Sequence, residues 1–194
     1  MLTVGVLALQ GAVAEHLELL GRIPGVRGAA VKTLEELQAL DGLILPGGES
    51  TAIGRLLRSF GLLEPLHAQI AAGLPVWGTC AGLILLARRI AGESAAHLGL
   101  MGIVARRNAY GGQLDSFRTE VLLPAISARA LTLVFIRAPY IESVAPGVEI
   151  LAEVDGKIVA AAEKNMLVTA FHPELTGDVR FHQYFIERFV KKIK

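Results

Sequence analysis

The chain has 194 residues, of which 53% are hydrophobic and 19% charged, and its formal net charge is +1. A chain of this length and hydrophobicity can bury one large core, so we expect a single domain over residues 1–194 and exclude an intrinsically disordered protein. A near-neutral charge gives no general attraction to nucleic acid or to an anionic membrane, so neither is expected as a partner. The one cysteine, Cys80, cannot form an intramolecular disulfide, which fits a cytoplasmic protein.

Two apolar stretches have the length of targeting or membrane segments but lack their other features. Residues 1–14 carry no charged side chain, and no Lys or Arg precedes the apolar part, so we expect a buried strand and not a signal peptide. Residues 65–87 are also uncharged over a length that could cross a bilayer, but His67, Pro75 and three glycines interrupt them. We expect this stretch to divide into a helix end, a strand and a second helix.

Apolar runs of strand length alternate with helical periodicity in the first half of the chain. This alternation is typical of a mainly parallel sheet with helices on both faces. The helix near the N-terminus is expected to bury Val13, Leu17 and Leu20, and a capping box at Thr33 and Glu36 marks the next helix start. In chain order we expect strands at 3–9, 26–31, 42–45 and 74–78, with helices at 12–23, from 33, and over much of 50–72.

After about residue 99 the pattern changes to strand-like pieces. Asp155-Gly156 lies between two of them and is a strong signal for a tight antiparallel hairpin, so the sheet is predicted to be mixed. We expect an amphipathic helix over 178–193 to close the chain. Its apolar residues recur every four positions, at Phe181, Phe185, Phe189 and Ile193. The expected strands are 102–105, 118–123, 131–136, 148–154, 157–162 and 166–171.

The most informative segment is Gly78-Thr79-Cys80-Ala81-Gly82, at a predicted strand-to-helix junction. It has the form Gly-x-Cys-x-Gly, the thiol counterpart of a nucleophile elbow, in which the glycines allow a sharp backbone turn. The central side chain is then exposed at the carboxyl end of the sheet, where open α/β sheets bind ligands, and a helix N-terminus stabilises a thiolate there. A lone cysteine is otherwise more often a small buried hydrophobic residue. The flanking glycines favour Cys80 as a nucleophile.

A thiolate nucleophile needs a base, and the base needs an orienting group. His172-Pro173-Glu174, just after the predicted strand 166–171, supplies both, because side chains two apart in extended chain share one face. The alternative for His172 is a surface loop histidine. Zinc deaminases also carry His-x-Glu, but they need a Cys-x-x-Cys element that this chain lacks. No metal is expected, since the other histidines show neither metal-ligand spacing nor comparable surroundings: His16, His67, His97 and His182.

A third segment, Pro46-Gly47-Gly48-Glu49-Ser50, follows a predicted strand. Two glycines there allow a backbone amide to point at a developing oxyanion, and Ala81, the residue after the cysteine, would supply a second amide. The alternative is an ordinary strand-to-helix turn, and Pro-Gly-Gly alone does not decide between them.

Taken together, and in the chain order Pro46–Ser50, Gly78–Gly82 and His172–Glu174, these three segments resemble the class I (triad) glutamine amidotransferases. Within that group the chain is similar to the glutaminase subunits of pyridoxal 5′-phosphate synthase, the PdxT family, and the resemblance covers nearly the whole chain. The one departure is Gly112, where the family pattern has arginine. The segments that carry the closer resemblance are Val6–Gly11, Gly48–Thr51, Arg107-Asn108, Gln113–Phe117 and Phe135–Pro139.

The resemblance implies a flavodoxin-like, three-layer α/β fold with a mixed, mainly parallel central sheet. It implies a glutaminase that hydrolyses L-glutamine to L-glutamate and ammonia, with no cofactor. The expected partner is the (β/α)8-barrel synthase subunit, which would receive the ammonia for vitamin B6 biosynthesis.

The resemblance also assigns roles to residues of this sequence. Cys80, His172 and Glu174 would form the catalytic triad, and amides of the Gly47-Gly48 turn and of Ala81 would hold the oxyanion. Arg107 and Arg137 are each chemically suited to bind the α-carboxylate of glutamine. The residues expected to contact glutamine are Gly48, Glu49, Ser50, Arg107, Ile136 and Arg137.

Other functions on the same fold are less consistent with the sequence. The glutaminase subunit for imidazole glycerol phosphate synthesis shares the triad and the size, but Gln10-Gly11 and Asp115-Ser116-Phe117 favour the PdxT family. A non-catalytic binding module would have lost the thiol, the imidazole or the oxyanion glycines, and none is lost here. Cysteine hydrolases that place histidine directly after the nucleophile are disfavoured, because this chain has Ala81 there.

Overall fold

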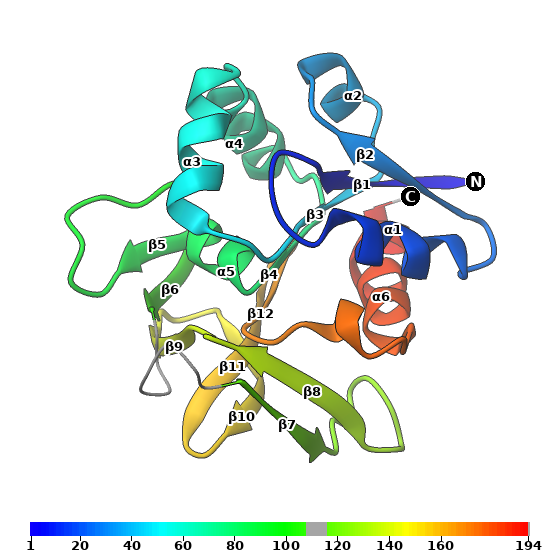
Figure 1. Cartoon of the computed structure of the whole chain (residues 1–194), viewed down its shortest axis with the longest axis vertical. Coiled ribbons are helices and arrows are strands. Elements are labelled where there is room, and N and C mark those ends of the chain that lie inside the picture. Colours follow the sequence, from blue (N-terminus) through cyan, green and yellow to red (C-terminus); the bar gives the residue numbers. More distant parts are fainter. Residues whose placement is uncertain (108–115, 194) are drawn as a thin grey trace.

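The computed structural model describes residues 1–107 and 116–193, and its centre is a mixed sheet of ten strands (Figure 1). In the parallel half, the strands lie in the order β2 (Val26–Val31), β1 (Leu2–Leu7), β3 (Gly42–Leu45), β4 (Val76–Thr79) and β12 (Met166–Thr169). Every residue of β3, β4 and β12 is buried, as expected for parallel strands covered on both faces. The order of the first four strands is that of flavodoxin-like sheets.

The other half of the sheet contains all of its antiparallel pairs. It continues from β12 through β11 (Lys157–Glu163), β9 (Tyr140–Val144), β6 (Met101–Arg106) and β5 (Ala87–Ile90), and β10 (Glu149–Val154) pairs with β11. Asp155 and Gly156 have φ of +50° and +71° and bring Val154 opposite Lys157. These values suit the tight hairpin turn that the sequence predicts. The predicted mixed, mainly parallel α/β fold is confirmed.

Two of these strands were missed by the sequence analysis. β5 carries two exposed arginines in four residues, and β9 begins directly after Pro139, so neither shows a clean apolar pattern. β7 (Ser116–Val121) and β8 (Leu131–Ile136) were predicted as strands, and they form a separate two-stranded sheet.

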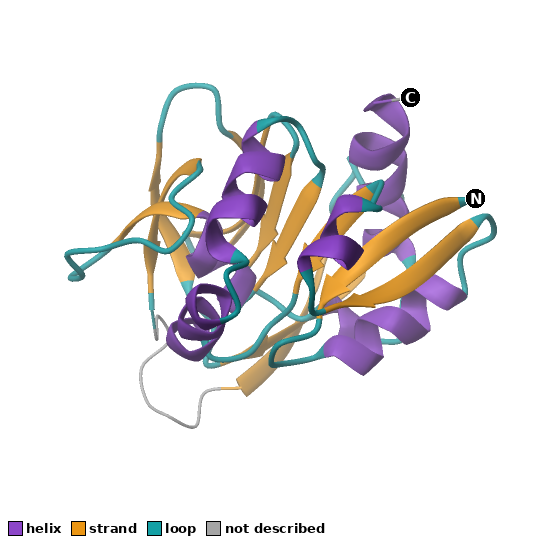
Figure 2. Cartoon of the chain, turned by 90° about the horizontal axis from the view of Figure 1, so that it is seen from above, coloured by secondary structure: helices purple, strands orange, loops and turns teal. Residues whose placement is uncertain are grey.

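Helices cover both faces of the main sheet (Figure 2). On one face, Leu17 and Leu20 of α1 pack against Gly28, and Phe185 and Val190 pack against Gly42. On the other face, α5 packs against β3 and β4. The helices are α1 (Val13–Gly21), α2 (Leu34–Gln38), α3 (Ser50–Ser59), α4 (Leu63–Ala71), α5 (Ala81–Leu86) and α6 (Arg180–Phe185), with the shorter turns η1 (Pro173–Leu175), η2 (Ile186–Val190) and η3 (Lys191–Ile193).

The starts and divisions of the helices follow the sequence prediction in three places. The capping box at Thr33 and Glu36 is present at the start of α2. Residues 65–87 divide as predicted into the end of α4, β4 and α5, and no helix in the described part of the chain is long and apolar enough to span a bilayer. The closing helix begins at Arg180 and passes into the π-helical turn η2, with its three phenylalanines buried; the side chain of Ile193 lies outside the described residues.

The predicted buried face of α1 is partly wrong. Val13 and Leu17 are half-buried, whereas His16 is fully buried beside Leu19 and Leu20. A periodicity argument treats histidine as polar and places it in water, so it cannot find a histidine that has polar partners inside the core.

Candidate active site

Cys80 lies at a strained turn between β4 and α5. Its φ is +47° and its ψ is −97°, which is a costly conformation for a residue with a side chain. The amide nitrogen of Cys80 donates a hydrogen bond of 2.7 Å to the carbonyl oxygen of Thr169 on β12. A Cβ at Gly78 would lie 2.4 Å from the carbonyl carbon of Gly82, and one at Gly82 would lie 2.1 Å from the carbonyl oxygen of Leu45. Both flanking positions therefore have room for glycine alone.

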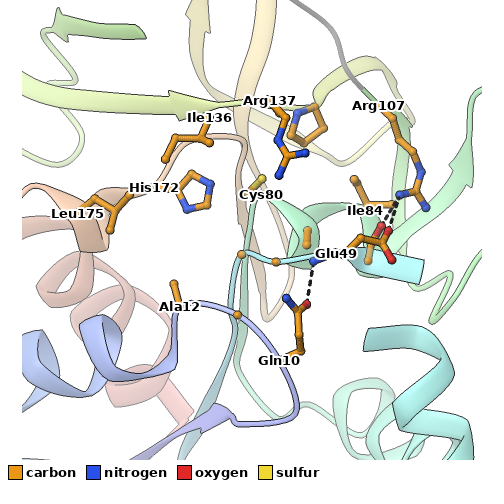
Figure 3. A pocket seen from close by; sticks show the side chains of 16 residues that line it. Gln10, Ala12, Glu49, Cys80, Ile84, Arg107, Ile136, Arg137, His172 and Leu175 are labelled. Carbon is orange, nitrogen blue, oxygen red and sulfur yellow. Dashed lines mark hydrogen bonds and ion pairs between the residues drawn. The ribbon is translucent and has the colours of Figure 1, made fainter. Parts of the chain in front are cut away.

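His172 and Glu174 follow β12, the strand next to β4. The amide nitrogen of His172 donates to the carbonyl oxygen of Val134 on β8 at 2.8 Å, and this bond holds the turn η1 in place. His172 Nδ1 lies 2.7 Å from Glu174 Oε1, whose side chain is fully buried. Figure 3 shows the His172 ring beside the sulfur of Cys80. The structure thus brings the three predicted triad residues together in the predicted order.

The surroundings of His172 favour its protonated form. Burial lowers its pKa, but hydrogen bonds to Cys80 and Glu174, together with the charges of these two groups, outweigh burial and raise the pKa to about 10. The ring is therefore an imidazolium at neutral pH, and its Nδ1–H donates to Glu174. Its second N–H faces Cys80, where it can act as a proton donor.

The Gly47-Gly48 turn lies directly against the triad. A Cβ at Gly47 would lie 2.4 Å from Cε1 of His172 and 3.5 Å from Cβ of Cys80, so a side chain here would displace the imidazole. The carbonyl oxygen of Gly47 accepts a hydrogen bond of 3.1 Å from the amide of Ala12. The Gly47 carbonyl and the Gly48 N–H belong to one trans peptide and point in opposite directions. Since the carbonyl points toward the amide of Ala12, the Gly48 N–H points away from it.

Gln10 was not predicted as a site residue, yet it holds the other side of this turn. Its Oε1 accepts a hydrogen bond of 2.8 Å from the amide of Glu49, and a Cβ at Gly48 would lie 2.5 Å from that oxygen (Figure 3). Gln10 stands in the loop after β1, where the sequence gives no sign of a contact with residues nearly forty positions away.

Glu49 and Arg107 form a charged edge of the site. Glu49 caps α3, and although burial alone would raise its pKa, hydrogen bonds from the amides of Thr51 and Ala52 lower the pKa below its ordinary value. Arg107 Nε lies 2.5 Å from Glu93 Oε1, and the guanidinium also bonds Ser50 and approaches Glu49 Oε1 at 3.7 Å. A guanidinium already fixed by carboxylates is positioned to receive a further carboxylate from a ligand.

These groups line one pocket of about 550 Å³ (Figure 3). Ten of the eleven predicted site residues line it, and the eleventh, Glu174, is buried behind His172. Arg137, at the rim, has φ of +44° and is exposed. The predicted lining residues are Gly47, Gly48, Glu49, Ser50, Cys80, Ala81, Arg107, Ile136, Arg137 and His172, and those not predicted are Gln10, Gly11, Ala12, Ile84, Pro139 and Leu175.

Two histidines that the sequence analysis set aside lie next to the triad. His16 Nε2 is 3.6 Å from Glu174 Oε2, and His16 Nδ1 is 2.9 Å from His182 Nε2, so the prediction that these histidines lack comparable surroundings is wrong. Within residues 1–107 and 116–193, no group of three or more His, Cys, Asp or Glu side chains is arranged to hold a metal ion. Asn108 and Gln113–Asp115, which belong to the segments that resemble the PdxT family, and Gly112, which departs from the family pattern, lie outside the described residues.

Comparisons with known proteins agree with this geometry. A family model described as the SNO glutamine amidotransferase family matches residues 6–191. The pyridoxal 5′-phosphate synthase subunit PdxT of Ruminiclostridium cellulolyticum is 56% identical over 187 residues, covering 96% of this chain and 99% of that protein. The protein of the same name from Clostridium botulinum is 53% identical over 191 residues, covering 98% of this chain and 99% of its own length.

Solved structures show the same likeness. A crystal structure described as a glutamine amidotransferase superposes with a TM-score of 0.88 at 41% identity, covering 95% of this chain and 97% of that one. A putative GMP synthase subunit from Thermoplasma acidophilum superposes with a TM-score of 0.69 at 18% identity over 100% of this chain and 96% of its own, and it shares the fold alone.

Proposed function

This chain belongs to the SNO glutamine amidotransferase family, and from that premise we propose that it is the glutaminase subunit of a pyridoxal 5′-phosphate synthase. It hydrolyses L-glutamine to L-glutamate and ammonia, and the ammonia is used for vitamin B6 biosynthesis. The observation that supports this best is the Cys80–His172–Glu174 arrangement at the bottom of a pocket whose wall is the Gly47-Gly48 turn.

The first step is attack of the Cys80 thiolate on the side-chain amide carbon of glutamine. A carbon–sulfur bond forms, and the carbonyl electron pair moves to oxygen. The amides of Ala81 and Gly48 hold this oxyanion, because both residues line the pocket beside the sulfur. The deprotonated sulfur is the attacking form, and the raised pKa of His172 keeps a protonated ring beside it.

The second step expels ammonia. The oxyanion collapses, the carbon–nitrogen bond breaks, and the His172 imidazolium gives its proton to the leaving nitrogen, so a glutamyl thioester and a neutral imidazole remain. The same imidazole then takes a proton from water, which attacks the thioester. Glutamate leaves, and the thiolate and imidazolium return. Glu174 keeps the ring in one orientation through both proton transfers.

Recognition of the substrate's amino acid end falls to the charged edge of the pocket. The α-carboxylate of glutamine pairs with Arg107 or Arg137, both of which line the pocket. Glu49, whose carboxylate is ionised at neutral pH, is suited to the α-ammonium group. Ile136 contacts the apolar stem.

Ammonia released into neutral solution is protonated and loses its nucleophilicity, so the product must pass directly to the enzyme that uses it. We propose the (β/α)8-barrel synthase subunit as that partner, in keeping with the name of the PdxT relatives, which are subunits of pyridoxal 5′-phosphate synthase. We also propose that the isolated chain is a poor glutaminase until the partner docks. Full glutaminase turnover by the isolated chain would contradict the requirement for docking.

The test is pyridoxal phosphate formation by the chain purified together with the synthase subunit. Glutamine and an ammonium salt are compared as nitrogen sources. Cys80→Ala should abolish the glutamine-dependent reaction and leave the ammonium-dependent reaction intact. If the variant affects both reactions equally, or neither, the proposed function is wrong.

A further inference from the structure

Behind the triad, a line of buried polar groups continues from Glu174 into the core. His16 of α1 places its Nε2 3.6 Å from Glu174 Oε2 and 3.4 Å from Thr79 Oγ1. Its other nitrogen, Nδ1, lies 2.9 Å from Nε2 of His182 on α6. The side chains of His16, Thr79 and His182 are fully buried. These side chains come from α1, β4 and α6, three elements distant in the sequence (Figure 1), and they meet beside the carboxylate of Glu174.

The two oxygens of Glu174 differ in their surroundings. Oε1 is bonded to His172, whereas Oε2 is buried with no hydrogen bond of ordinary length. A buried carboxylate oxygen without a donor is costly. His16 Nε2 lies 3.6 Å from this oxygen, and a shortening of a few tenths of an ångström would bring the two atoms within hydrogen-bond distance.

Both histidines behind Glu174 are neutral. Burial, and then the repulsion that a protonated His182 or His172 would exert, hold the pKa of His16 well below its usual value, and burial lowers the pKa of His182 to about 3. A neutral imidazole carries one N–H and one lone pair, so the pair has two ways to share the 2.9 Å contact.

Only one of the two ways suits the carboxylate. If His182 Nε2–H donates to His16 Nδ1, then His16 carries its proton on Nε2 and offers an N–H to Glu174 Oε2. The reverse assignment would point a lone pair of His16 Nε2 at Glu174 Oε2, and although Thr79 Oγ1 at 3.4 Å could donate to that lone pair, Oε2 would be left without a donor. His182 Nδ1 has no hydrogen-bond partner; it is an acceptor in the accepted assignment, whereas the reverse assignment would leave a buried N–H donor there unsatisfied.

Trp77 on β4 fixes the two rings in this arrangement. Its ring meets His16 edge-on at 5.7 Å between centroids and His182 edge-on at 4.9 Å. Its own Nε1–H is engaged by Thr169 Oγ1 at 3.2 Å and does not compete for the imidazoles. The packing of the core thus sets the position and the rotation of His16.

We propose that His16 is a positioning residue of the glutaminase: its Nε2–H holds the second oxygen of Glu174, so that the carboxylate keeps His172 aligned with Cys80, and His182 fixes the tautomer of His16. This proposal deepens the proposed function and rests on it for its kinetic test. His16 touches neither the substrate nor the reacting atoms.

The kinetic test compares His16→Leu, which removes the donor at similar volume, with His16→Gln, which keeps an N–H near the position of Nε2. In the complex with the synthase subunit, His16→Leu should lower kcat for glutamine by about tenfold to a hundredfold and change KM less than twofold. The reason is that a less well aligned His172 slows the proton transfer but does not change the binding of glutamine. His16→Gln should recover most of the loss. His67→Leu, a half-buried histidine of α4, is the matched control and should leave kcat unchanged.

Three outcomes would overturn the proposal: unchanged kcat in His16→Leu, a KM effect without a kcat effect, or His16→Gln as impaired as His16→Leu. The ammonium-dependent reaction monitors the integrity of each complex and should stay at the level of the unmodified chain. If His16→Leu fails to fold, the comparison of His16→Gln with the unmodified chain and the measurement below still decide the question.

Nitrogen NMR of histidine-labelled protein tests the geometry without any activity. Both His16 and His182 should appear as neutral rings protonated on Nε2 at every pH from 5 to 9. A proton on Nδ1 of His16, or its titration near pH 6.5, would overturn the proposal. This result does not depend on the proposed function, so its failure is distinguishable from the absence of glutaminase activity in the unmodified chain.

Discussion

The amide of Ala12 donates a 3.1 Å hydrogen bond to the carbonyl oxygen of Gly47, and this bond ties the loop after β1 to the turn beside the triad. It fixes the direction of the Gly47-Gly48 peptide, and therefore of the Gly48 N–H to which we assign the oxyanion.

Gly11→Ala should break this bond, because a Cβ at Gly11 would lie 1.8 Å from the carbonyl oxygen of Gly47. Loss of one oxyanion donor lowers kcat by about a hundredfold to a thousandfold, and we expect a fall of that size in glutamine turnover by the complex. Gly92→Ala is the control: Gly92 also has positive φ, +81°, but a Cβ there meets nothing within 4 Å. Equal kcat values for the two variants would show that the peptide direction does not matter.

Cys80→Ala should lower the pKa of His172, since the hydrogen bond and charge of Cys80 help to raise it to about 10. An NMR titration of the His172 ring checks this directly, with the unmodified chain titrating near pH 10. Because the folded-state pKa exceeds the ordinary value of 6.5, the stabilisation it brings is complete below pH 6.5 and is lost as pH rises toward 10. The unfolding free energy of Cys80→Ala should therefore fall less over this range. A His172 ring that titrates near 6.5 in the unmodified chain contradicts the imidazolium assignment.

His182→Leu should reduce the sensitivity of the fold to acid. Burial lowers the pKa of His182 to about 3. Below pH 6.5 this histidine therefore binds a proton in the unfolded chain but not in the folded chain. Stability is then complete above pH 6.5 and falls by about 1.4 kcal/mol per pH unit below it for such a histidine. Urea unfolding of both proteins between pH 6.5 and 4.5 gives the two slopes. Parallel slopes would mean that His182 is not buried in its neutral form.

Arg107→Met should raise KM for glutamine by about tenfold or more while changing kcat little, because an arginine that binds the α-carboxylate contributes equally before and during the reaction. Arg106→Met is the control, since Arg106 is exposed and pairs with Glu142 at 2.6 Å on the neighbouring strand. If Arg137→Met raises KM and Arg107→Met does not, the carboxylate is assigned to Arg137.

The sequence predicted the parts of this molecule whose cause is local. The Asp155-Gly156 hairpin, the capping box at Thr33 and the split of residues 65–87 each depend on neighbouring residues, and all three are present. The glycines around Cys80 work in the same way, since a sharp turn needs small residues at fixed offsets. Local chemistry also placed His172 and Glu174 together, because they are two residues apart.

What the sequence did not predict depends on contacts between distant segments. His16 and His182 are 166 positions apart, and only the packing of α1 and α6 against Trp77 makes them partners. Gln10 and the amide of Glu49 are 39 positions apart. β5 contains two arginines and β9 follows a proline, so the composition of neither indicates a strand. Both form strands because they pair with β6.

The proposed nucleophile and its proton donor follow two adjacent paired strands, β4 and β12, whose last residues, Thr79 and Thr169, are in register. Their approach is thus set by the spacing of two paired strands and by the bond that ties His172 to Val134, although roughly ninety residues connect them. Loops of that connecting stretch that lie outside the pocket and outside these pairings can therefore change in length to suit another partner without moving the two groups.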